Sequence, residues 1–418
     1  MEQRMPKDVL PIEVESADAL IIGAGPAGLC CALRLAGQGL RVCVVERQTE
    51  RSIAEPDFDG REIALTHRSV QTLQRIGVWA RISAEEISPL ENALVMTGRS
   101  PHRLHFDRQS GASGVLGFLV PNQAIRRAAH RQAAANPHIQ LRYERQVADV
   151  RTTPAGVSVR LSQGAVQASQ GTLQASQGAV QARLLIAADS RFSDTRRAVG
   201  IAADMLDFGK TMLVCRMRHA VPHEQTAWEW FQDRSTLALL PLNDRTSSIV
   251  ITVPAAEARR LMEIDPQAFE RDVEARFDRR LGAMQLCSSR HSYPLVAVYA
   301  RHFAAERCAL IGDAAIGMHP VTAHGFNLGL QSLERLAAEL GRAAGAGLDI
   351  GSLAVLRRYE AAHHRSARPL YLATNAVVRL YTDARPLHTL VRTVGLRLAD
   401  RLPPFKRAIV ASLTNVAG

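Results

Sequence analysis

A glycine-rich turn near the N-terminus has the residue types and the spacing that bind the phosphates of a dinucleotide. Gly23, Gly25 and Gly28 lie between an apolar run, 18–22, and a run with helical periodicity, 29–35. The first glycine permits a tight turn, the second lets the backbone approach a pyrophosphate, and the third lets the helix pack on the strand. The N-terminus of the helix adds free N–H groups for the phosphates.

An acidic residue completes this pattern. Glu46 ends the next predicted strand, 41–46, about twenty residues after the glycines, where a carboxylate can bind a ribose hydroxyl. An acid at this position favours FAD or NAD over NADP. The turn itself does not separate FAD from NAD, and a glycine turn without a ligand is the alternative.

A second group of polar residues and glycines lies far along the chain. Asp313 follows a short apolar run, and the segment 325–329 opens a long predicted helix, 328–344. A carboxylate in such a turn can accept a hydrogen bond from a ribityl hydroxyl, and a helix N-terminus beside it stabilises negative charge on a reduced flavin ring. These features favour FAD over NAD.

The segment 312–331 resembles the second flavin motif of the class A FAD-dependent aromatic hydroxylases, the para-hydroxybenzoate hydroxylase superfamily. The segment 185–191, followed by Arg196 and Arg197, resembles the Asp-Gly motif of the same superfamily. Ser190 stands where that motif usually has glycine. The resemblance covers nearly the whole chain.

Other segments resemble one family within this superfamily, the hydroxylases of ubiquinone biosynthesis. They are 59–65, 120–122 and the pair His319-Pro320. The segment 322–325 is similar to the UbiM-like branch, which is associated with 5-demethoxyubiquinol hydroxylation.

The resemblance implies a set of FAD-binding residues. Those at the adenosine diphosphate part are Gly23, Gly25, Gly28, Glu46 and Arg47. Those along the remaining cofactor are Arg61, Asn122, Asp189, Asp313, Gly325, Phe326 and Asn327. Two candidate catalytic residues would lie at the flavin ring: Pro320 lines it, and His324 can tune it because histidine titrates near physiological pH. A hydrogen-bonded loop histidine is the alternative for His324.

The implied reaction begins with reduction of FAD by NAD(P)H or another reductant. Capture of O2 as a flavin C4a-hydroperoxide then permits hydroxylation of a lipophilic aromatic substrate, a prenylated ubiquinone precursor such as 5-demethoxyubiquinol. A flavin-dependent prenyl-chain reductase, a hydroxylase of another small aromatic and a non-catalytic FAD-binding subunit are the alternatives. No histidine or cysteine cluster has the spacing of a metal site.

The sequence predicts an α/β fold with a Rossmann-like FAD-binding domain, an interleaved β-sheet substrate domain and C-terminal helices. The predicted FAD-binding domain is discontinuous and comprises 1–80, 110–200 and 300–345. The substrate domain comprises 81–109 and 201–299, and the helical region is 346–418. In the substrate domain, Trp228, Trp230 and Phe231 are candidates for an apolar pocket or for core. Three copies of a seven-residue repeat, 162–182, are predicted to form a loop insertion in a hairpin.

Composition favours a globular enzyme. The chain has 418 residues, 47% of them hydrophobic, and a net charge of +11. The segment 350–418 has ten arginines and one lysine against three acidic residues, a net charge of +8. Such a region fits a membrane surface or a biosynthetic complex. Only 5% of residues are aromatic, so nucleic acid is not an expected partner. The N-terminus lacks a secretory signal, which predicts a cytoplasmic protein, soluble or peripheral to the membrane.

Overall fold

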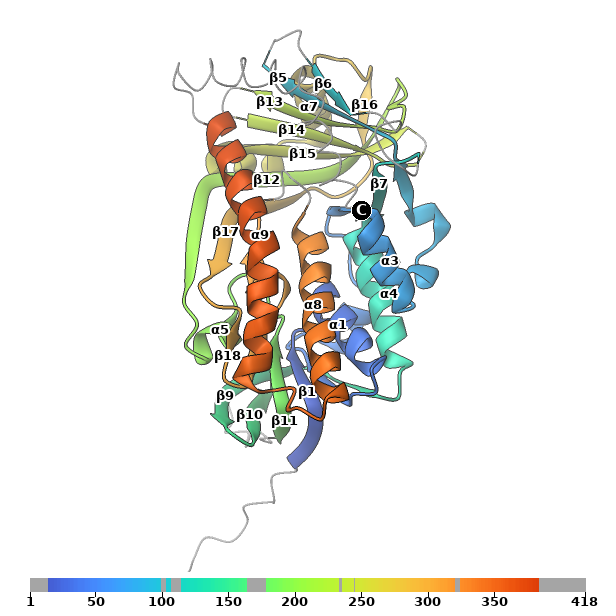
Figure 1. Ribbon diagram of the computed structural model, residues 1–418. Helices are drawn as coiled ribbons and strands as arrows, with labels where there is room; N and C mark the ends of the chain where they lie inside the picture. The colour runs from blue at the N-terminus through green and yellow to red at the C-terminus, as the bar shows by residue number, and fades with distance from the viewer. Residues whose placement is uncertain are drawn as a thin grey trace, which may run out of the picture.

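The computed structural model describes residues 14–98, 103–106, 114–163, 178–232, 235–243, 245–319 and 324–382. Two large sheets dominate the described chain, one at each end of the molecule in Figure 1, with long helices running between them.

The first sheet is parallel in its centre. Its parallel strands, in spatial order, are β8 (Ile139–Arg142), β2 (Val42–Val45), β1 (Val14–Ile22), β11 (Gly178–Ala187) and β19 (Cys308–Leu310). Three antiparallel strands extend it: β18 (Ala304–Ala305), β10 (Gly156–Gln163) and β9 (Arg145–Thr153). The central strands are continuous apolar runs because a parallel sheet is buried on both faces. The strand, turn, helix and strand predicted around the glycine turn are confirmed by β1, α1 and β2.

The second sheet is mostly antiparallel. Its strands, in spatial order, are β20 (Ile316–Gly317), β17 (His291–Ala300), β12 (Ala203–His219), β15 (Thr246–Pro254), β14 (Ser235–Pro241), β13 (Thr226–Gln232), β5 (Asn92–Thr97) and β6 (Arg103–Phe106), with β16 (Met284–Leu286) beside β12. A small third sheet contains β3 (Glu62–Leu65), β7 (Gly117–Pro121) and β4 (Ser88–Leu90).

Helices cover these sheets and connect them. The α-helices are α1 (Pro26–Ala36), α2 (Glu50–Ala54), α3 (His67–Arg75), α4 (Asn122–Ala134), α5 (Asp194–Ala198), α6 (Ala255–Glu263), α7 (Pro266–Arg276), α8 (Gly325–Gly345) and α9 (Leu353–Thr382). Short 3-10 turns occupy Trp79–Arg81, Ala84–Glu86 and Gly312–Ala314. Helices α1, α4, α8 and α9 form a layer in which α1 packs against α4 and α8, and α8 against α9 (Figure 1). Among the described residues, no helix has both the length and the apolar character that a membrane span requires.

The two faces of the second sheet have different environments. Alternate residues of β12, β14 and β15, such as Leu213, Leu239 and Ile251, form a core with residues of α7 such as Phe269. Because side chains alternate along a strand, the intervening residues face the other way, toward the first sheet. Trp230 is buried within this core, where its indole N–H donates to the Gly98 carbonyl at 2.9 Å.

The sequence between and beyond these sheets forms a hairpin, part of a strand and a long helix. Antiparallel β14 and β15 form the hairpin around Asn243. Of the repeat, 164–177 lies outside the described residues, and part of the third copy, 178–182, forms the first half of β11. Helix α9 continues through Pro369. Proline removes one backbone hydrogen bond, and the buried contacts of α9 through Tyr359 and Tyr371 hold the helix together.

Candidate functional site

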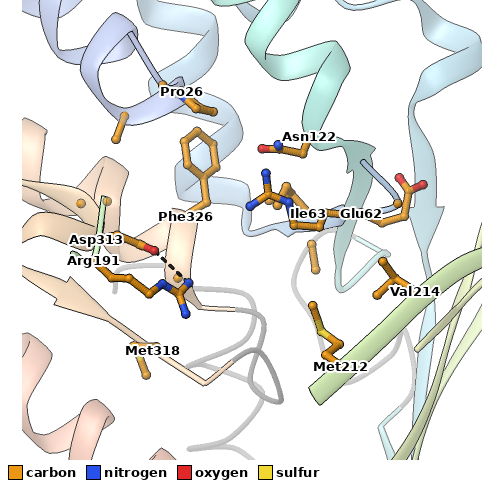
Figure 2. Close-up of a pocket in the computed structure, with 18 of the residues that line it drawn as sticks. Pro26, Glu62, Ile63, Asn122, Arg191, Met212, Val214, Asp313, Met318 and Phe326 are labelled. Carbon is orange, nitrogen blue, oxygen red and sulfur yellow. Dashed lines mark hydrogen bonds and ion pairs between the residues drawn. The ribbon is translucent and has the colours of Figure 1, made fainter. Parts of the chain in front are cut away.

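A cavity of about 540 Å³ lies between the first sheet and the second. At one end it is lined by residues of the glycine turn, including Gly25 and Pro26. At the other end it is lined by the inward face of β12 to β15, from which Met212 and Val214 point into the cavity (Figure 2). One cavity therefore joins the predicted dinucleotide site to the second sheet.

The glycine turn is closed on two sides and open on the third. A Cβ at Gly28 would lie 1.9 Å from the Gly23 carbonyl oxygen, and one at Gly23 would lie 2.6 Å from the Ala188 carbonyl oxygen. Gly23 also has a φ of +107°, which favours glycine. At Gly25 nothing lies within 4 Å of an added Cβ. The turn therefore packs tightly on the sheet and leaves its backbone accessible from the cavity, as binding of a pyrophosphate requires.

The Glu46 carboxylate lies beside this turn and lines the cavity. It accepts hydrogen bonds from the backbone N–H of Ala24 at 2.8 Å and of Gln48 at 2.9 Å. These bonds fix the carboxylate where β2 ends, next to the start of α1. Arg47 is exposed and is not among the lining residues, so its contact with the cofactor stays a prediction.

Asp59 organises the opposite wall of the cavity. Its carboxylate accepts hydrogen bonds from Arg61 at 2.6 Å and from the Asn122 amide at 2.7 Å. Burial raises the pKa of Asp59, but the charge of Arg61 and these hydrogen bonds outweigh burial and hold the pKa below its usual value. Arg61 and Asn122 line the cavity, and their contact with FAD stays a prediction; Asp59 was missing from the predicted site. The position of Asp59 directly before the turn at Gly60 is the sequence feature that could have indicated its role.

Removal of this carboxylate should weaken cofactor binding. We expect Asp59→Ala to leave Arg61 and Asn122 without their shared acceptor, at a cost of about 2 kcal/mol in FAD affinity. Fluorescence titration of the apoprotein with FAD measures the effect. Asp57→Ala is the matched control, since Asp57 is exposed and lines no part of the cavity. Equal affinities for the two variants would contradict the role of Asp59.

The predicted second flavin motif packs directly on the first. Gly312 has a φ of +57°, and a Cβ added there would lie 3.1 Å from the Cβ of Ala27. The turn at Gly312 places the Asp313 carboxylate in the cavity wall, where it accepts a hydrogen bond from Arg191 at 3.0 Å (Figure 2). Asp313 is therefore held at the cavity by an arginine that the prediction did not include, and its contact with FAD stays a prediction.

The start of α8 is the third part of this wall. Gly325 and Phe326 line the cavity, and the Phe326 ring lies near Pro26 at the start of α1 (Figure 2). Asn327 is buried and does not line the cavity; its amide oxygen accepts from Ser69 at 2.6 Å and from the backbone N–H of Thr66 at 3.1 Å. Its side chain therefore fastens α8 to α3. The N-termini of α1 and α8 both face this cavity, which suits an anionic ligand.

The predicted Asp-Gly motif has a structural role in the described contacts. The Asp189 carboxylate accepts from Ser193 Oγ and from the Thr195 backbone N–H at 3.0 Å, and it is not among the lining residues. Its contact with FAD stays a prediction. Ser190 lines the cavity and has a φ of +84°, a left-handed conformation that glycine adopts more easily. The serine therefore holds a strained position at the cavity wall.

The histidines near the predicted flavin ring differ in position. Pro320 lies outside the described residues, so its predicted role stays a prediction. His324 is buried, precedes α8 and is not among the lining residues; its catalytic role also stays a prediction. His319 lines the cavity, with the Phe208 ring 4.8 Å away, and burial together with the charge of Lys210 lowers its pKa to about 4. It is therefore neutral at physiological pH.

Several other lining residues were not predicted. Arg126 lies one helical turn after Asn122 on α4, and burial lowers its pKa. Glu62 and Glu229 also line the cavity, from β3 and β13. Helical spacing from Asn122 indicates that Arg126 lies on the same face of α4. The two glutamates lie in apolar strands, and the sequence does not show which face of each strand meets the cavity. Trp228 and Trp230 are not lining residues, because they pack on the opposite face of the sheet; Phe231 is buried and is also outside the lining.

The described residues fit FAD and offer no metal centre. The open backbone at Gly25, the fixed Glu46 carboxylate and the two helix N-termini match the needs of a pyrophosphate and a ribose. No group of three or more histidine, cysteine, aspartate or glutamate residues in the described chain is arranged to hold a metal.

Comparison with known proteins agrees with this geometry. The model of the FAD binding domain family matches residues 16–370. The chain is 42% identical to the ubiquinone hydroxylase UbiM of Neisseria meningitidis, over 96% of this chain and 85% of that protein. It is 32% identical to the ubiquinone hydroxylase UbiL of Rhodospirillum rubrum, over 94% and 88% of the two chains.

A solved structure has the same fold. It is the p-nitrophenol 4-monooxygenase PnpA of Pseudomonas putida, with a TM-score of 0.75, 18% identity and coverage of 97% of this chain and 100% of that one. The cavity, the family match and these relatives identify FAD as the cofactor. The chain belongs to the family of FAD-dependent monooxygenases that includes the ubiquinone hydroxylases.

Proposed function

We propose that this protein hydroxylates the aromatic ring of a prenylated ubiquinone precursor such as 5-demethoxyubiquinol. In the overall reaction, NAD(P)H supplies two electrons, one oxygen atom of O2 enters the ring and the other leaves as water. One observation carries the proposal: a single cavity connects the FAD-binding turn with an apolar sheet face that an aromatic ring can cover. The 42% identity to a ubiquinone hydroxylase supports the choice of substrate.

The residues of the site divide into three proposed tasks. The start of α1, with Glu46, binds the pyrophosphate and ribose, and Arg61, Asn122 and Asp313 bind along the rest of the cofactor. The start of α8 faces the flavin ring and stabilises negative charge on it. FAD, when bound, supplies the chemistry that activates O2. The side chains of the second sheet exclude water and hold the substrate ring.

Three predicted features remain part of this proposal. Pro320 and His324 are proposed to lie at the flavin ring, and Asp189 and Arg47 to contact the cofactor. The FAD-binding domain would comprise 1–80, 110–200 and 300–345, with the substrate domain in 81–109 and 201–299.

Mass spectrometry of quinones in cells that lack this protein tests the proposed function. We expect a prenylated precursor missing one ring hydroxyl to accumulate, and the intact gene to restore the normal quinone. A gene copy with Gly25→Ala should not restore the normal quinone. The added methyl group clashes with no protein atom but occupies the space that the pyrophosphate needs. Accumulation of a quinone with an unsaturated chain but a complete ring would favour the prenyl-chain reductase instead.

The basic C-terminal region is proposed to contact anionic lipid. The support is its net charge of +8 over 350–418 and the lipophilic nature of the proposed substrate. Residues 383–418 lie outside the described structure. Sedimentation with vesicles tests the contact: binding to vesicles that contain phosphatidylglycerol, lost at high salt, is expected. Equal binding to neutral vesicles, or none, would contradict it and leave a biosynthetic complex as the alternative.

A further inference from the structure

Glu229 on β13 differs from its neighbours in the cavity wall. The other residues that line the cavity from β12 to β15 are aliphatic or carry a hydroxyl group, and they are Met212, Val214, Thr236, Ala238, Leu240, Ser248, Val250 and Thr252. Among the described lining residues of these four strands, Glu229 is the only one with an ionisable side chain. No local pattern singles out Glu229, because it lies between two tryptophans in a short strand.

Within the cavity lining, Glu229 stands at the end of an apolar row, because its partner on the other side, Val95 of β5, does not line the cavity. Glu229 pairs with Ala238, Ala238 pairs with Val250, and Val250 pairs with Val214. Directly paired residues of neighbouring strands share a face of the sheet. The row therefore crosses four strands as a platform of small aliphatic side chains with one carboxyl group at its end. Such a surface matches a flat ring that carries an oxygen substituent on one edge.

The environment of this carboxyl group is unusual for a structural residue. The residue is only partly buried, and its accessible surface faces the cavity. In the described part of the chain it has no hydrogen-bond or ion-pair partner, and burial alone raises its pKa to about 8. A polar group that faces a cavity from an otherwise apolar wall can orient a ligand by a hydrogen bond. At neutral pH the group is mostly a neutral acid that can donate a hydrogen bond.

We propose that Glu229 positions the aromatic substrate by donating a hydrogen bond from its carboxyl group to a hydroxyl or methoxy oxygen on the ring. The inference rests on the proposed function and names a specificity residue for it. The platform Val214–Val250–Ala238 holds the ring face, and Glu229 fixes its rotation within the cavity, so that one ring carbon faces the flavin. Substrates without an oxygen at that edge are bound less tightly and are turned over with less selectivity.

Two variants of Glu229 test the assignment in the full-length, FAD-loaded protein. Glu229→Gln keeps a neutral hydrogen-bond donor of similar shape and should retain most of the activity. Glu229→Leu removes the donor, and we expect KM for the quinol to rise about tenfold, the value for one lost hydrogen bond of about 1.4 kcal/mol. Loss of ring orientation should also divert reduced flavin to hydrogen peroxide, measured as peroxide released per NAD(P)H consumed.

The pH dependence of kcat/KM distinguishes a direct contact of Glu229 with the substrate from a purely structural role. Wild-type kcat/KM should fall as pH rises through about 8, where Glu229 ionises, and Glu229→Gln should lack this fall. The described residues of the adjacent strands β14 and β5 have no ionisable side chain. On β12, three strands away, Lys210 and Arg216 are charged. The other charged or titratable groups in the cavity lining are Glu46, Arg61, Glu62, Arg126, Arg191, Asp313 and His319, and all of them are retained in both variants.

Measurements of stability and of quinol binding distinguish a failure of the role of Glu229 from a failure of the proposed function. Glu229→Leu should melt at or above the wild-type temperature, because it places an apolar side chain in an otherwise apolar wall. The change of flavin fluorescence on adding quinol to the oxidised protein measures binding without turnover. If the wild type hydroxylates the quinol and both variants bind and hydroxylate it as the wild type does, the role of Glu229 is wrong. If the wild type itself does not hydroxylate it, the proposed function is wrong instead.

Discussion

Gly28→Ala is expected to abolish FAD binding and to lower the yield of folded protein sharply. The added Cβ would lie 1.9 Å from the Gly23 carbonyl oxygen, far inside contact distance, and the atom it meets is backbone. Because α1 packs against α4 and α8, it cannot move away without opening the core. Overpacking that displaces a helix costs about 3 kcal/mol or more. Thermal melting and the ratio of flavin to protein absorbance measure the two effects.

Two other glycines provide matched controls for Gly28. At Gly25 and Gly345 nothing lies within 4 Å of an added Cβ. Gly25→Ala should fold with the wild-type melting temperature as apoprotein and yet bind FAD poorly, since its methyl group points where the pyrophosphate approaches. Gly345→Ala, at the end of α8, should be normal in both measurements. Full flavin content in Gly28→Ala would contradict the close packing of the turn.

Arg216→Met is expected to destabilise the protein strongly and more at high pH. Two nitrogens of Arg216 donate to Glu62 Oε1 at 2.8 and 2.6 Å, and the Glu62 side chain is fully buried. Burial raises the pKa of Glu62, and the charge of Arg216 partly opposes this. Removal of the cation leaves a buried carboxylate without compensation, at a cost of about 3 kcal/mol at neutral pH. Chemical denaturation at several pH values measures the loss.

The sign of the pH effect follows from protonation. The pKa of Glu62 is higher in the folded than in the unfolded state. At pH values above the unfolded-state pKa, the folded state therefore keeps this proton more often than the unfolded state does. The contribution of Glu62 to stability is therefore greatest below its unfolded-state pKa and is lost as pH rises through its folded-state pKa. Arg216→Met raises the folded value further, so its loss of stability should be smaller at pH 5 than at pH 8.

A double variant and a surface control test this explanation. Glu62→Gln combined with Arg216→Met removes the buried charge and should recover part of the stability lost in the single variant. Arg218→Met, two residues along β12 at an exposed position, should change the free energy of unfolding by less than about 0.5 kcal/mol. Equal losses for Arg216→Met and Arg218→Met would show that the buried pair does not matter.

Local patterns predicted the parts of the site that short segments determine. The turn at Gly23 to Gly28 and the acid at Glu46 have a spacing that backbone geometry dictates, and the structure places both at the cavity. Asp313 and Gly325 follow a strand and open a helix, and they also line the cavity. Such features depend on neighbours within a few residues, so the sequence contains the information directly.

The remaining parts depend on contacts between distant segments. The partner of Asp313 is Arg191, and the partner of Glu62 is Arg216; no local spacing indicates either pair. The direction of Trp228 and Glu229 depends on which face of β13 meets α7 and which meets the cavity. Both tryptophans are apolar enough for a pocket or a core, and the choice requires the packed second sheet.

Incorporation of labelled oxygen tests the central claim most directly. The purified protein, loaded with FAD, is incubated with 5-demethoxyubiquinol, NAD(P)H and ¹⁸O₂, and the product is analysed by mass spectrometry. We expect a ring-hydroxylated product with one ¹⁸O atom, formed with one NAD(P)H consumed per product. A product whose new oxygen comes from water, or oxidation of NAD(P)H that yields only hydrogen peroxide with the ring unchanged, would contradict it.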